Sequence, residues 1–420
     1  MIERNEIELM APAGSYEALM GAIQGGADSV YFGVEQLNMR SASSANFTLD
    51  DLARITAICR EHGLKSYLTV NTVLYDSDLP AMRTVLDRAK GEGVTAIIAS
   101  DQAAIVYARS IGLPVHISTQ LNVSNAETVA FYAPFAEVVV LARELNLKQI
   151  RAIYDQIVAR DLRGPGGERV KIELFAHGAL CMAISGKCYL SLHETGHSAN
   201  RGACRQICRR TYTVQDTETG AKLEVDNPHI MSPKDLCTID FLDEVIGAGV
   251  RVLKIEGRAR SAEYVKRVCT AYNEALSALA DGSYTSQRVE VWKKQLAEVF
   301  NRGFWGGYYL GQRLGEWSRN YGSSATRRKV YVGKVIHYFP GPGVAEILVE
   351  AAPLHTGEEL LLMGETTGVL EWQADTPWVD EQPAPCVRQG TKCSLKTPTT
   401  VRRNDKLYKW VDATTDSQQG

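Results

Sequence analysis

The sequence predicts a (β/α)8 barrel of the TIM type, followed by a small all-β domain that is barrel-like. Two observations predict the barrel. Short apolar runs alternate with amphipathic stretches from the start of the chain, and the apolar runs are continuous, as is typical of parallel strands buried on both faces. Eight such units in roughly 280 residues fit a (β/α)8 barrel. An open doubly wound sheet is the alternative that this pattern leaves.

Each element of the barrel follows from a local pattern. The strands are expected where the apolar runs lie, at Ile7–Met10, Ser29–Phe32, Ser66–Val70, Ala96–Ala99, Val115–Ser118, Val138–Leu141, Lys171–Phe175 and Val252–Ile255. The helices are expected over the amphipathic stretches Tyr16–Gly25, Leu49–His62, Ala81–Gly91, Gln102–Ser110, Ala126–Phe131, Leu147–Ala159, Ile239–Ala248 and Ala262–Leu279. These periodicities are the main signals of secondary structure in a sequence.

The pattern changes after Ala280. Val289–Val299 predicts one more helix, and the periodicity from Val330 onward is strand-like, with turn signals at Pro340-Gly-Pro-Gly and Met363-Gly. The expected divisions are a barrel over 1–285 with a cysteine-rich insertion at 178–238, a helix and connector over 286–328, a β-domain over 329–413 and a frayed tail over 414–420.

Composition limits the function classes. The chain is 45% hydrophobic and 23% charged, with a net charge of −3, so any contact with nucleic acid must come from local basic patches. The N-terminus does not resemble a signal peptide, and no apolar run approaches the length of a membrane span. We therefore expect a cytoplasmic protein without a membrane partner.

The cysteines are the strongest chemical signal. Five of the nine lie between residues 181 and 237, and clustered cysteines in a reducing compartment favour metal binding over disulfides. Four of them are the predicted metal ligands: Cys181, Cys188, Cys204 and Cys208. The segment follows the seventh strand, which places it at the C-terminal mouth of a barrel, where active sites are built.

Four thiolates fit either zinc or an iron–sulfur cluster. Zinc sites favour two closely spaced cysteine pairs, and only Cys204 and Cys208 have such spacing, so the spacing favours a cluster. Unligated core cysteines are the third interpretation. Cys237 is an alternative ligand in place of Cys208, although we favour a small buried residue at the start of a helix.

Two other motifs need to be weighed. His193-Glu-Thr-Gly-His197 matches the H-E-x-x-H pattern of zinc peptidases, which places two histidines on one face of a helix. Gly196 and the polar flanking residues argue against such a helix and favour a solvated loop. Cys204-x-x-x-Cys208 lacks the third cysteine of a radical-SAM triplet.

The segment from Glu173 to Ser191, with Cys181 and Cys188 inside it, resembles the signature of the collagenase-type peptidase family U32. Three further stretches agree with this resemblance, which covers about residues 7–280: Leu9–Gly14, Gly26–Gly33 and Leu253–Arg258. The β-rich C-terminal region also resembles the appended domain of the family.

The resemblance implies a function other than the one in the family name. Its better understood branches are oxygen-independent hydroxylases that carry a 4Fe-4S cluster and act on tRNA uridine, on a ribosomal RNA cytidine or on a quinone precursor. This chain looks most like the tRNA branch, which implies 5-hydroxylation of the wobble uridine, the tRNA anticodon loop as partner and prephenate as oxygen donor. A U32-type peptidase is the alternative function. The electron donor is unidentified, and a homodimer stays open.

The resemblance also implies the cluster ligands. The family's ligands correspond to Cys181, Cys188, Cys204 and Cys208. Some members lack the counterpart of Cys208 and use a later cysteine, which keeps Cys237 open.

Polar residues at the predicted C-terminal ends of the strands are the candidate catalytic residues, because side chains there converge on the barrel mouth. They are Asn71, Gln120, Arg143, His177, Glu256 and Arg258. Arg143 and Arg258 are suited to bind a carboxylate or phosphate, and prephenate carries two carboxylates. Asp101 is the weakest candidate, since it is equally an ordinary helix N-cap.

Basic residues beside the cysteines are the candidate RNA contacts. Arg201, Arg205, Arg209 and Arg210 are expected to bind phosphates, and Arg327, Arg328 and Lys329 in the connector would extend that surface. Solvated surface charge is the alternative for each of them.

Overall fold

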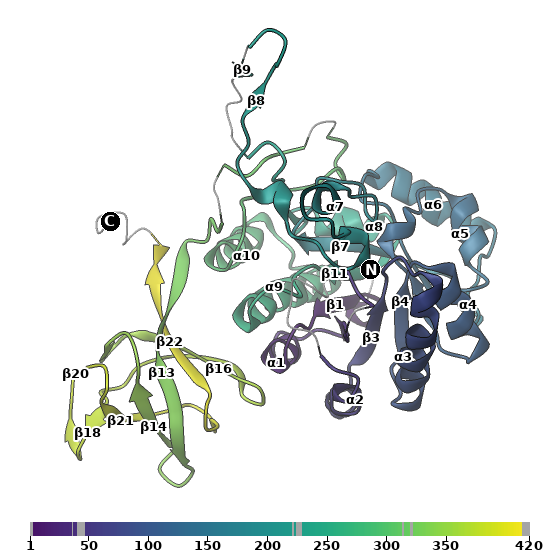
Figure 1. Ribbon diagram of the computed structural model, residues 1–420. Helices are drawn as coiled ribbons and strands as arrows, with labels where there is room; N and C mark the ends of the chain where they lie inside the picture. The colour runs from purple at the N-terminus through teal and green to yellow at the C-terminus, as the bar shows by residue number, and fades with distance from the viewer. Residues whose placement is uncertain are drawn as a thin grey trace.

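The computed structural model describes residues 3–35, 37–39, 47–220, 222–223, 229–312, 315–319 and 322–413. Within it, eight parallel strands form a closed barrel surrounded by helices (Figure 1), which confirms the predicted fold class. Closure is seen in the pairing, because the last barrel strand pairs with both the first and the seventh. The strands are β1 (Glu8–Pro12), β2 (Ser29–Phe32), β3 (Lys65–Val70), β4 (Ala96–Ala99), β5 (Val115–Ile117), β6 (Val138–Val140), β7 (Lys171–Gly178) and β11 (Val250–Ile255).

The helices of the barrel begin where the sequence supplies N-cap residues. The side chains of Ser15, Asp101, Asn125 and Asn146 each accept a hydrogen bond from a backbone N–H of the following first turn, which satisfies a donor that has no partner within the helix. The helices are α1 (Tyr16–Gln24), α2 (Asp51–Glu61), α3 (Leu79–Gly91), α4 (Gln102–Ser110), α5 (Ala126–Tyr132), α6 (Leu147–Ala159), α8 (Leu242–Gly247) and α9 (Ala262–Asp281).

The inside of the barrel is a packed core. Alternate strand residues point inward, and seven of them form a buried cluster that is separate from the larger core between strands and helices. That cluster consists of Met10, Tyr31, Tyr67, Ala96, Ile98, Val138 and Val252.

Strand β7 extends three residues beyond its predicted end at Phe175. The reason is a partner far away in the sequence, because β10 (Asp235–Cys237) pairs antiparallel with the end of β7 and β12 (Phe304–Trp305) pairs with β10. Gly178, the last residue of β7, has a φ of +107°, and a Cβ there would lie 2.4 Å from the carbonyl oxygen of Glu256. Only glycine fits where the chain leaves the barrel for the cysteine segment.

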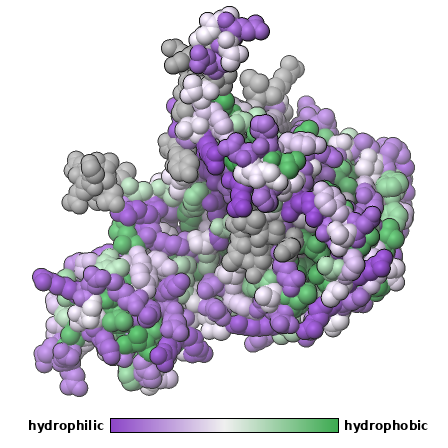
Figure 2. Space-filling view, in the orientation of Figure 1, coloured by the Kyte–Doolittle hydropathy of each residue, from purple (hydrophilic) through white to green (hydrophobic). Residues whose placement is uncertain are grey.

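The insertion after β7 contains little regular structure. A short helix, α7 (Leu190–Thr195), lies near the barrel mouth, and the hairpin of β8 (Val214–Gln215) and β9 (Lys222–Leu223) projects away from the body of the protein (Figure 1). The described residues of this projection are mainly hydrophilic (Figure 2). The expectation of a loop over residues 193–197 was wrong in part, because His193, Glu194 and Thr195 lie in α7.

The C-terminal region is an antiparallel sheet of eight strands around its own buried core, as predicted for an all-β domain. The turn signals at Pro340 and Met363-Gly364 fall where β13 joins β14 and where β16 joins β17. The sheet contains β13 (Arg327–Phe339), β14 (Val344–Val349), β16 (Glu359–Gly364), β17 (Gly368–Gln373), β18 (Trp378–Val379), β19 (Gln382–Pro383), β21 (Lys392–Lys396) and β22 (Lys406–Asp412), and β15 (Leu354–His355) pairs separately with β20 (Cys386–Val387).

This sheet packs against the helical outside of the barrel, close to α1 and α9 (Figure 1). Gln24 of α1 bonds to the backbone of Val369, and Arg267 of α9 forms an ion pair with Glu371 at 2.7 Å. Helix α10 (Ser286–Glu298) packs on α9 and joins the two parts. The predicted tail, 414–420, lies outside the described residues. Across the described part of the chain, no helix has both the length and the apolar character that crossing a membrane requires.

Candidate metal and substrate site

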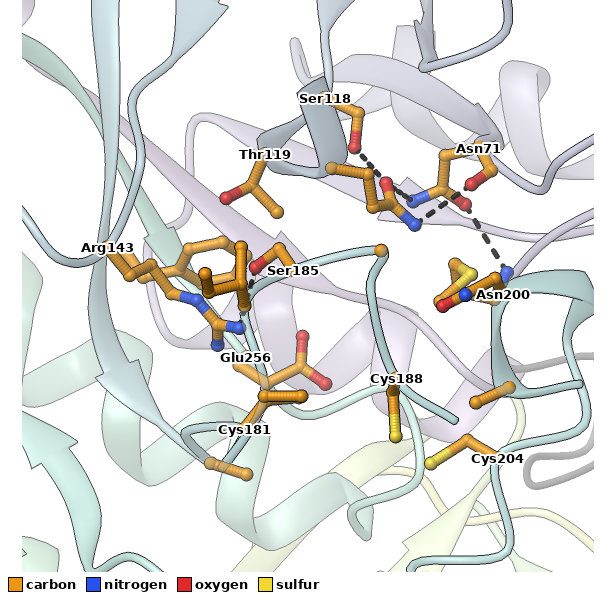
Figure 3. Close-up of a pocket in the computed structure, with 18 of the residues that line it drawn as sticks. Asn71, Ser118, Thr119, Arg143, Cys181, Ser185, Cys188, Asn200, Cys204 and Glu256 are labelled. Atoms are coloured by element: carbon orange, nitrogen blue, oxygen red, sulfur yellow. Dashed lines mark hydrogen bonds between the residues drawn. The ribbon is translucent and has the colours of Figure 1, made fainter. Parts of the chain in front are cut away.

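One pocket opens at the C-terminal mouth of the barrel, between the strand ends and the cysteine segment (Figure 3). It encloses about 1100 Å³ of space between atoms, part of which is open to solvent. All four predicted ligands line it, namely Cys181, Cys188, Cys204 and Cys208. Five of the six candidate catalytic residues line it as well: Asn71, Gln120, Arg143, Glu256 and Arg258.

The four thiols share this pocket and interact electrostatically. Burial raises the pKa of Cys208, Arg209 lowers it, and the negative charges of the other three thiolates raise it further. Cys181 is exposed, whereas the other three are half-buried. In Figure 3 the sulfur atoms of Cys188 and Cys204 point into the same part of the pocket. Among the described residues, no three His, Cys, Asp or Glu side chains are close enough to hold one metal ion.

Cys237 lies elsewhere. It is buried on β10, within 4.0 Å of the hydroxyl of Tyr272, and burial raises its pKa to about 12. It does not line the pocket. The expectation of a small buried residue agrees with this position, but Cys237 belongs to a strand rather than to the start of a helix.

Asn71 and Gln120 form a polar wall of the pocket. The side-chain amide of Asn71 donates to Oε1 of Gln120 at 3.0 Å, and Gln120 donates back to the backbone carbonyl of Asn71 at 2.9 Å. The hydroxyl of Ser118 also donates to Gln120 (Figure 3). These bonds join the ends of β3 and β5 and hold both amides at the mouth.

Arg143 connects the end of β6 to the cysteine segment. Its guanidinium donates to the hydroxyl of Ser185 at 2.7 Å and lies 5.6 Å from the ring centre of Phe175 (Figure 3). Burial lowers the pKa of Arg143, but a hydrogen bond to Cys181 and the negative charges of Cys181 and Glu256 raise it overall. Arg143 is therefore a fixed positive charge beside one of the thiols.

The floor of the pocket carries two buried cations. Arg258 donates to the side chains of Asn38 at 3.0 Å and Thr69 at 2.9 Å. Lys254 donates to a carboxylate oxygen of Glu173 at 2.8 Å, and both side chains are buried. We did not predict Lys254 or Glu173 as site residues. The signal was available for Lys254, since alternation along β11 places it on the same face as Val252, which points into the barrel.

His177 is the candidate that the structure does not bring to the pocket. The register of β7 against β11 shifts between Phe175 and His177, and the His177 ring packs against Tyr272 and Phe304 instead. It is 1% exposed, and burial and the charge of Arg260 lower its pKa to about 3. Strict alternation predicts an inward side chain, and the irregularity turns it away.

Asp101 is the N-cap of α4. Its carboxylate accepts hydrogen bonds from the backbone N–H groups of Ala103 and Leu74 at 2.9 and 3.1 Å. Asp101 does not line the pocket, so its role as a helix N-cap is sufficient to explain this residue.

The four arginines beside the cysteines differ in their surroundings. Arg209 is held by the backbone carbonyl of Pro233 at 2.8 Å and is only partly accessible. Arg201 forms an ion pair with Asp78 at 2.7 Å. Arg205 and Arg210 are exposed, and Arg210 reaches Glu194 at 3.2 Å. The structure therefore leaves Arg205 and Arg210 on the surface and uses Arg209 internally.

The basic residues at 327–329 are part of β13, not of a connector. Arg327 pairs with Glu359 at 2.6 Å, and Lys329 pairs with Glu263 at 2.7 Å. Arg328 lies exposed on the same strand. Since acidic partners neutralise Arg327 and Lys329, the expected extension of a basic surface is not seen there.

The H-E-x-x-H motif does not have the geometry of a zinc peptidase. Helix α7 ends at Thr195, and Gly196 follows in the left-handed conformation. His193 lies in the helix, and His197 lies beyond its end, where its ring contacts the carbonyl of Thr195 at 2.7 Å. The two histidines therefore do not share a helix face, as that motif requires.

Comparison with known proteins places the chain in a family. The family model for peptidase family U32 matches residues 14–319. A protein named collagenase from Porphyromonas gingivalis is 57% identical over 406 residues, covering 97% of this chain and 98% of the relative. The tRNA hydroxylation protein P1 of Bacillus subtilis is 32% identical, covering 79% and 77%, and the 23S rRNA 5-hydroxycytidine C2501 synthase of Escherichia coli is 37% identical, covering 67% and 41%. The chain therefore belongs to peptidase family U32.

Proposed function

We propose that this chain is an oxygen-independent iron–sulfur hydroxylase of RNA that converts the wobble uridine of tRNA to 5-hydroxyuridine in the cytoplasm. One observation carries the proposal. Four cysteine thiols and a set of polar and cationic side chains line the same pocket at the barrel mouth. The names of two relatives describe RNA hydroxylation and 5-hydroxycytidine synthesis, and both chemistries need a pocket that admits a pyrimidine ring.

The donor set supports a 4Fe-4S cluster held by Cys181, Cys188, Cys204 and Cys208. The thiolates of such a cluster bind different irons, so their sulfurs surround a wider space than the ligands of one zinc ion, which lie about 2.3 Å from the metal. The four thiols line one pocket, so all four donors of a cluster lie around the same space. When bound, such a cluster would relay electrons between the pyrimidine and the oxygen donor during the transfer of a hydroxyl group.

The side chains of the chain have separate roles in this proposal. Arg143 holds the cysteine segment against the barrel through Ser185, which keeps the thiols at the mouth. Arg143 and Arg258 offer planar cations for the carboxylates of prephenate, the proposed oxygen donor. Asn71 and Gln120 form the polar wall against which a base splayed out of a single-stranded loop would lie.

RNA contacts outside the pocket are assigned to the exposed arginines. Arg205 follows Cys204 directly, Arg210 lies two positions after Cys208, and both arginines are exposed. Phosphate contacts of this kind position RNA without reading its sequence. The wobble uridine would thus be selected by the shape of the anticodon loop and by the pocket.

A peptidase is the second candidate, and one observation favours it. The collagenase from Porphyromonas gingivalis is more similar to this chain than the hydroxylation proteins are, at 57% against 32% and 37% identity. The positions of His193 and His197 do not support zinc proteolysis. A peptidase would therefore have to use groups of the same pocket.

Two measurements test the proposal. The protein, purified without oxygen, should be brown and contain iron and sulfide, and tRNA from a deletion strain should lack 5-hydroxyuridine derivatives in nucleoside mass spectrometry. Re-expression should restore these nucleosides, whereas the Cys181→Ser variant should not. Unchanged tRNA in the deletion strain, together with cleavage of gelatin by the purified protein, would favour the peptidase.

A further inference from the structure

We propose that the ammonium group of Lys254 at the floor of the pocket is a binding site for a negatively polarised oxygen atom of the substrate, and that Glu173 and His116 position it. The inference rests on the proposed function and adds a residue to it. Lys254 lines the pocket but is only 5% exposed. Its position at the end of a barrel strand is where substrate-binding groups converge.

The arrangement around Lys254 fixes the direction of its ammonium group. One N–H donates to Glu173 at 2.8 Å, and Nζ lies 4.5 Å from the ring centre of Tyr31. The described residues supply a hydrogen-bond acceptor for only this one of the three N–H groups of an ammonium. A ligand oxygen in the pocket would complete the set.

A histidine lies on the other side of Glu173. The second carboxylate oxygen of Glu173 lies 3.6 Å from Nδ1 of His116, and Glu173 is 0% exposed. The His116 ring packs against Tyr67, with ring centres 4.5 Å apart. Glu173 and His116 do not line the pocket, so they act on a ligand only through Lys254.

A purely structural role explains this arrangement less well. The inner positions of such barrels are usually filled by bulky branched apolar residues, and apolar residues of similar volume often stabilise a protein as well as a buried ion pair does. The apolar layer of this barrel includes Met10, Ile98 and Val252. The ion pair of Lys254 and Glu173 takes the place of such apolar packing directly below the pocket, where Lys254 can contact a bound ligand.

Two kinds of ligand carry a suitable oxygen. One is the carbonyl group of a pyrimidine ring, and the other is a carboxylate of the oxygen-donating co-substrate. Both accept hydrogen bonds from an ammonium group, and hydrogen bonds to charged groups are the stronger kind.

The test uses a double variant, because the single change Lys254→Met leaves Glu173 buried without a partner. Lys254→Met combined with Glu173→Gln removes both charges together. The matched control is Lys65→Met, which removes a lysine that pairs with Glu8 at 2.6 Å near the other end of the barrel. Thermal unfolding first establishes that the double variant is folded.

We expect the double variant to hydroxylate an anticodon stem-loop with kcat/KM lowered roughly 10- to 100-fold. This factor corresponds to the loss of one hydrogen bond to a charged group. The Lys65→Met control should match the wild-type protein. If the ligand is the base, replacing the target uridine by 4-thiouridine should lower the kcat/KM of the wild-type protein. The same replacement should cause no additional loss in the double variant. If it is the carboxylate, the defect should appear in the KM for the co-substrate.

The outcomes separate the two proposals. A folded double variant whose kcat/KM stays within about twofold of wild type would overturn the role of Lys254 while leaving the hydroxylase intact. A wild-type protein that gives no product would overturn the hydroxylase. In that case equilibrium binding of the stem-loop and of the co-substrate decides the question for Lys254, since unchanged Kd values for both ligands in the double variant would refute the assignment.

Discussion

Breaking the buried ion pair of Lys254 and Glu173 should cost far more stability than removing it completely. The two charged atoms are 2.8 Å apart, and the side chains are 6% and 0% exposed. At an effective dielectric constant of 20, their attraction is about 6 kcal/mol, and most of it offsets the cost of taking two ions out of water. Lys254→Met removes the attraction but leaves the buried carboxylate, so we expect a loss of about 3–5 kcal/mol in the free energy of unfolding.

A double-mutant cycle measures this effect. Lys254→Met, Glu173→Gln and the double variant are unfolded in urea and followed by circular dichroism. The double variant should be more stable than either single variant, because it leaves no buried charge without a partner. If the two single effects simply add, the side chains do not interact and the reasoning fails.

The pH dependence of this cycle has a definite sign. Burial raises the pKa of Glu173, but Lys254 and His116 together lower it by more than burial raises it. The pKa of Glu173 is therefore shifted downward from 4.5. A carboxyl group whose pKa is lowered by folding stabilises the folded state above its unfolded pKa and loses that contribution as pH falls through the folded value. The coupling energy should therefore be full at neutral pH and be lost only as the pH falls below 4.5 and through the lowered pKa of Glu173 in the folded protein.

Three further predictions concern the cluster, the RNA surface and a buried histidine. The Cys181→Ser variant, purified without oxygen, should lose the visible absorption and the iron of the protein. The control Cys386→Ser changes an exposed cysteine of the C-terminal domain and should keep both. Equal loss or equal retention in the two variants would contradict the assigned ligand set. Arg205→Ala should reduce the slope of log K for RNA binding against log salt concentration by about one. Arg209→Met should leave that slope unchanged but lower the free energy of unfolding. A reversed pattern would show that the arginine at 209 is the phosphate contact. Burial and Arg260 lower the pKa of His177 to about 3, so the unfolded chain takes up the proton first as the pH falls. The free energy of unfolding should therefore decrease by about 1.4 kcal/mol per pH unit below pH 6.5. His177→Phe should remove this part of the slope, and identical acid titrations of the two proteins would refute the prediction.

Local patterns were sufficient for most of the barrel. Strands at Ser29–Phe32 and Ala96–Ala99 and helices at Gln102–Ser110 and Leu147–Ala159 have the bounds that the sequence predicts. Their apolar periodicity lies within each element, and the cap residues Asp101 and Asn146 directly precede the two helices, so no distant partner is needed to recognise them. The end of β7 was missed because its partner, β10, is more than fifty residues away in the chain.

The candidate site shows the same division. The cysteine segment was recognisable because its position after the seventh strand places it at the barrel mouth. The position directly after the end of β11 accounts for Glu256 and Arg258, and alternation within β11 should also have indicated Lys254. His177 was misplaced because a change of register in β7 breaks that alternation.

Sequence by itself determined the alternation of strands and helices, the order of these elements and the family resemblance, since these depend on residues close together in the chain, whereas closure of the barrel is seen only in the pairing of β11 with β1 and β7. Only the tertiary structure decided which polar groups meet. It brought four cysteines into one pocket and left Cys237 outside, and it paired Lys254 with Glu173, 81 positions away. The physical reason is that side-chain direction depends on strand register and closure, and these are set by pairing between distant segments rather than by local pattern.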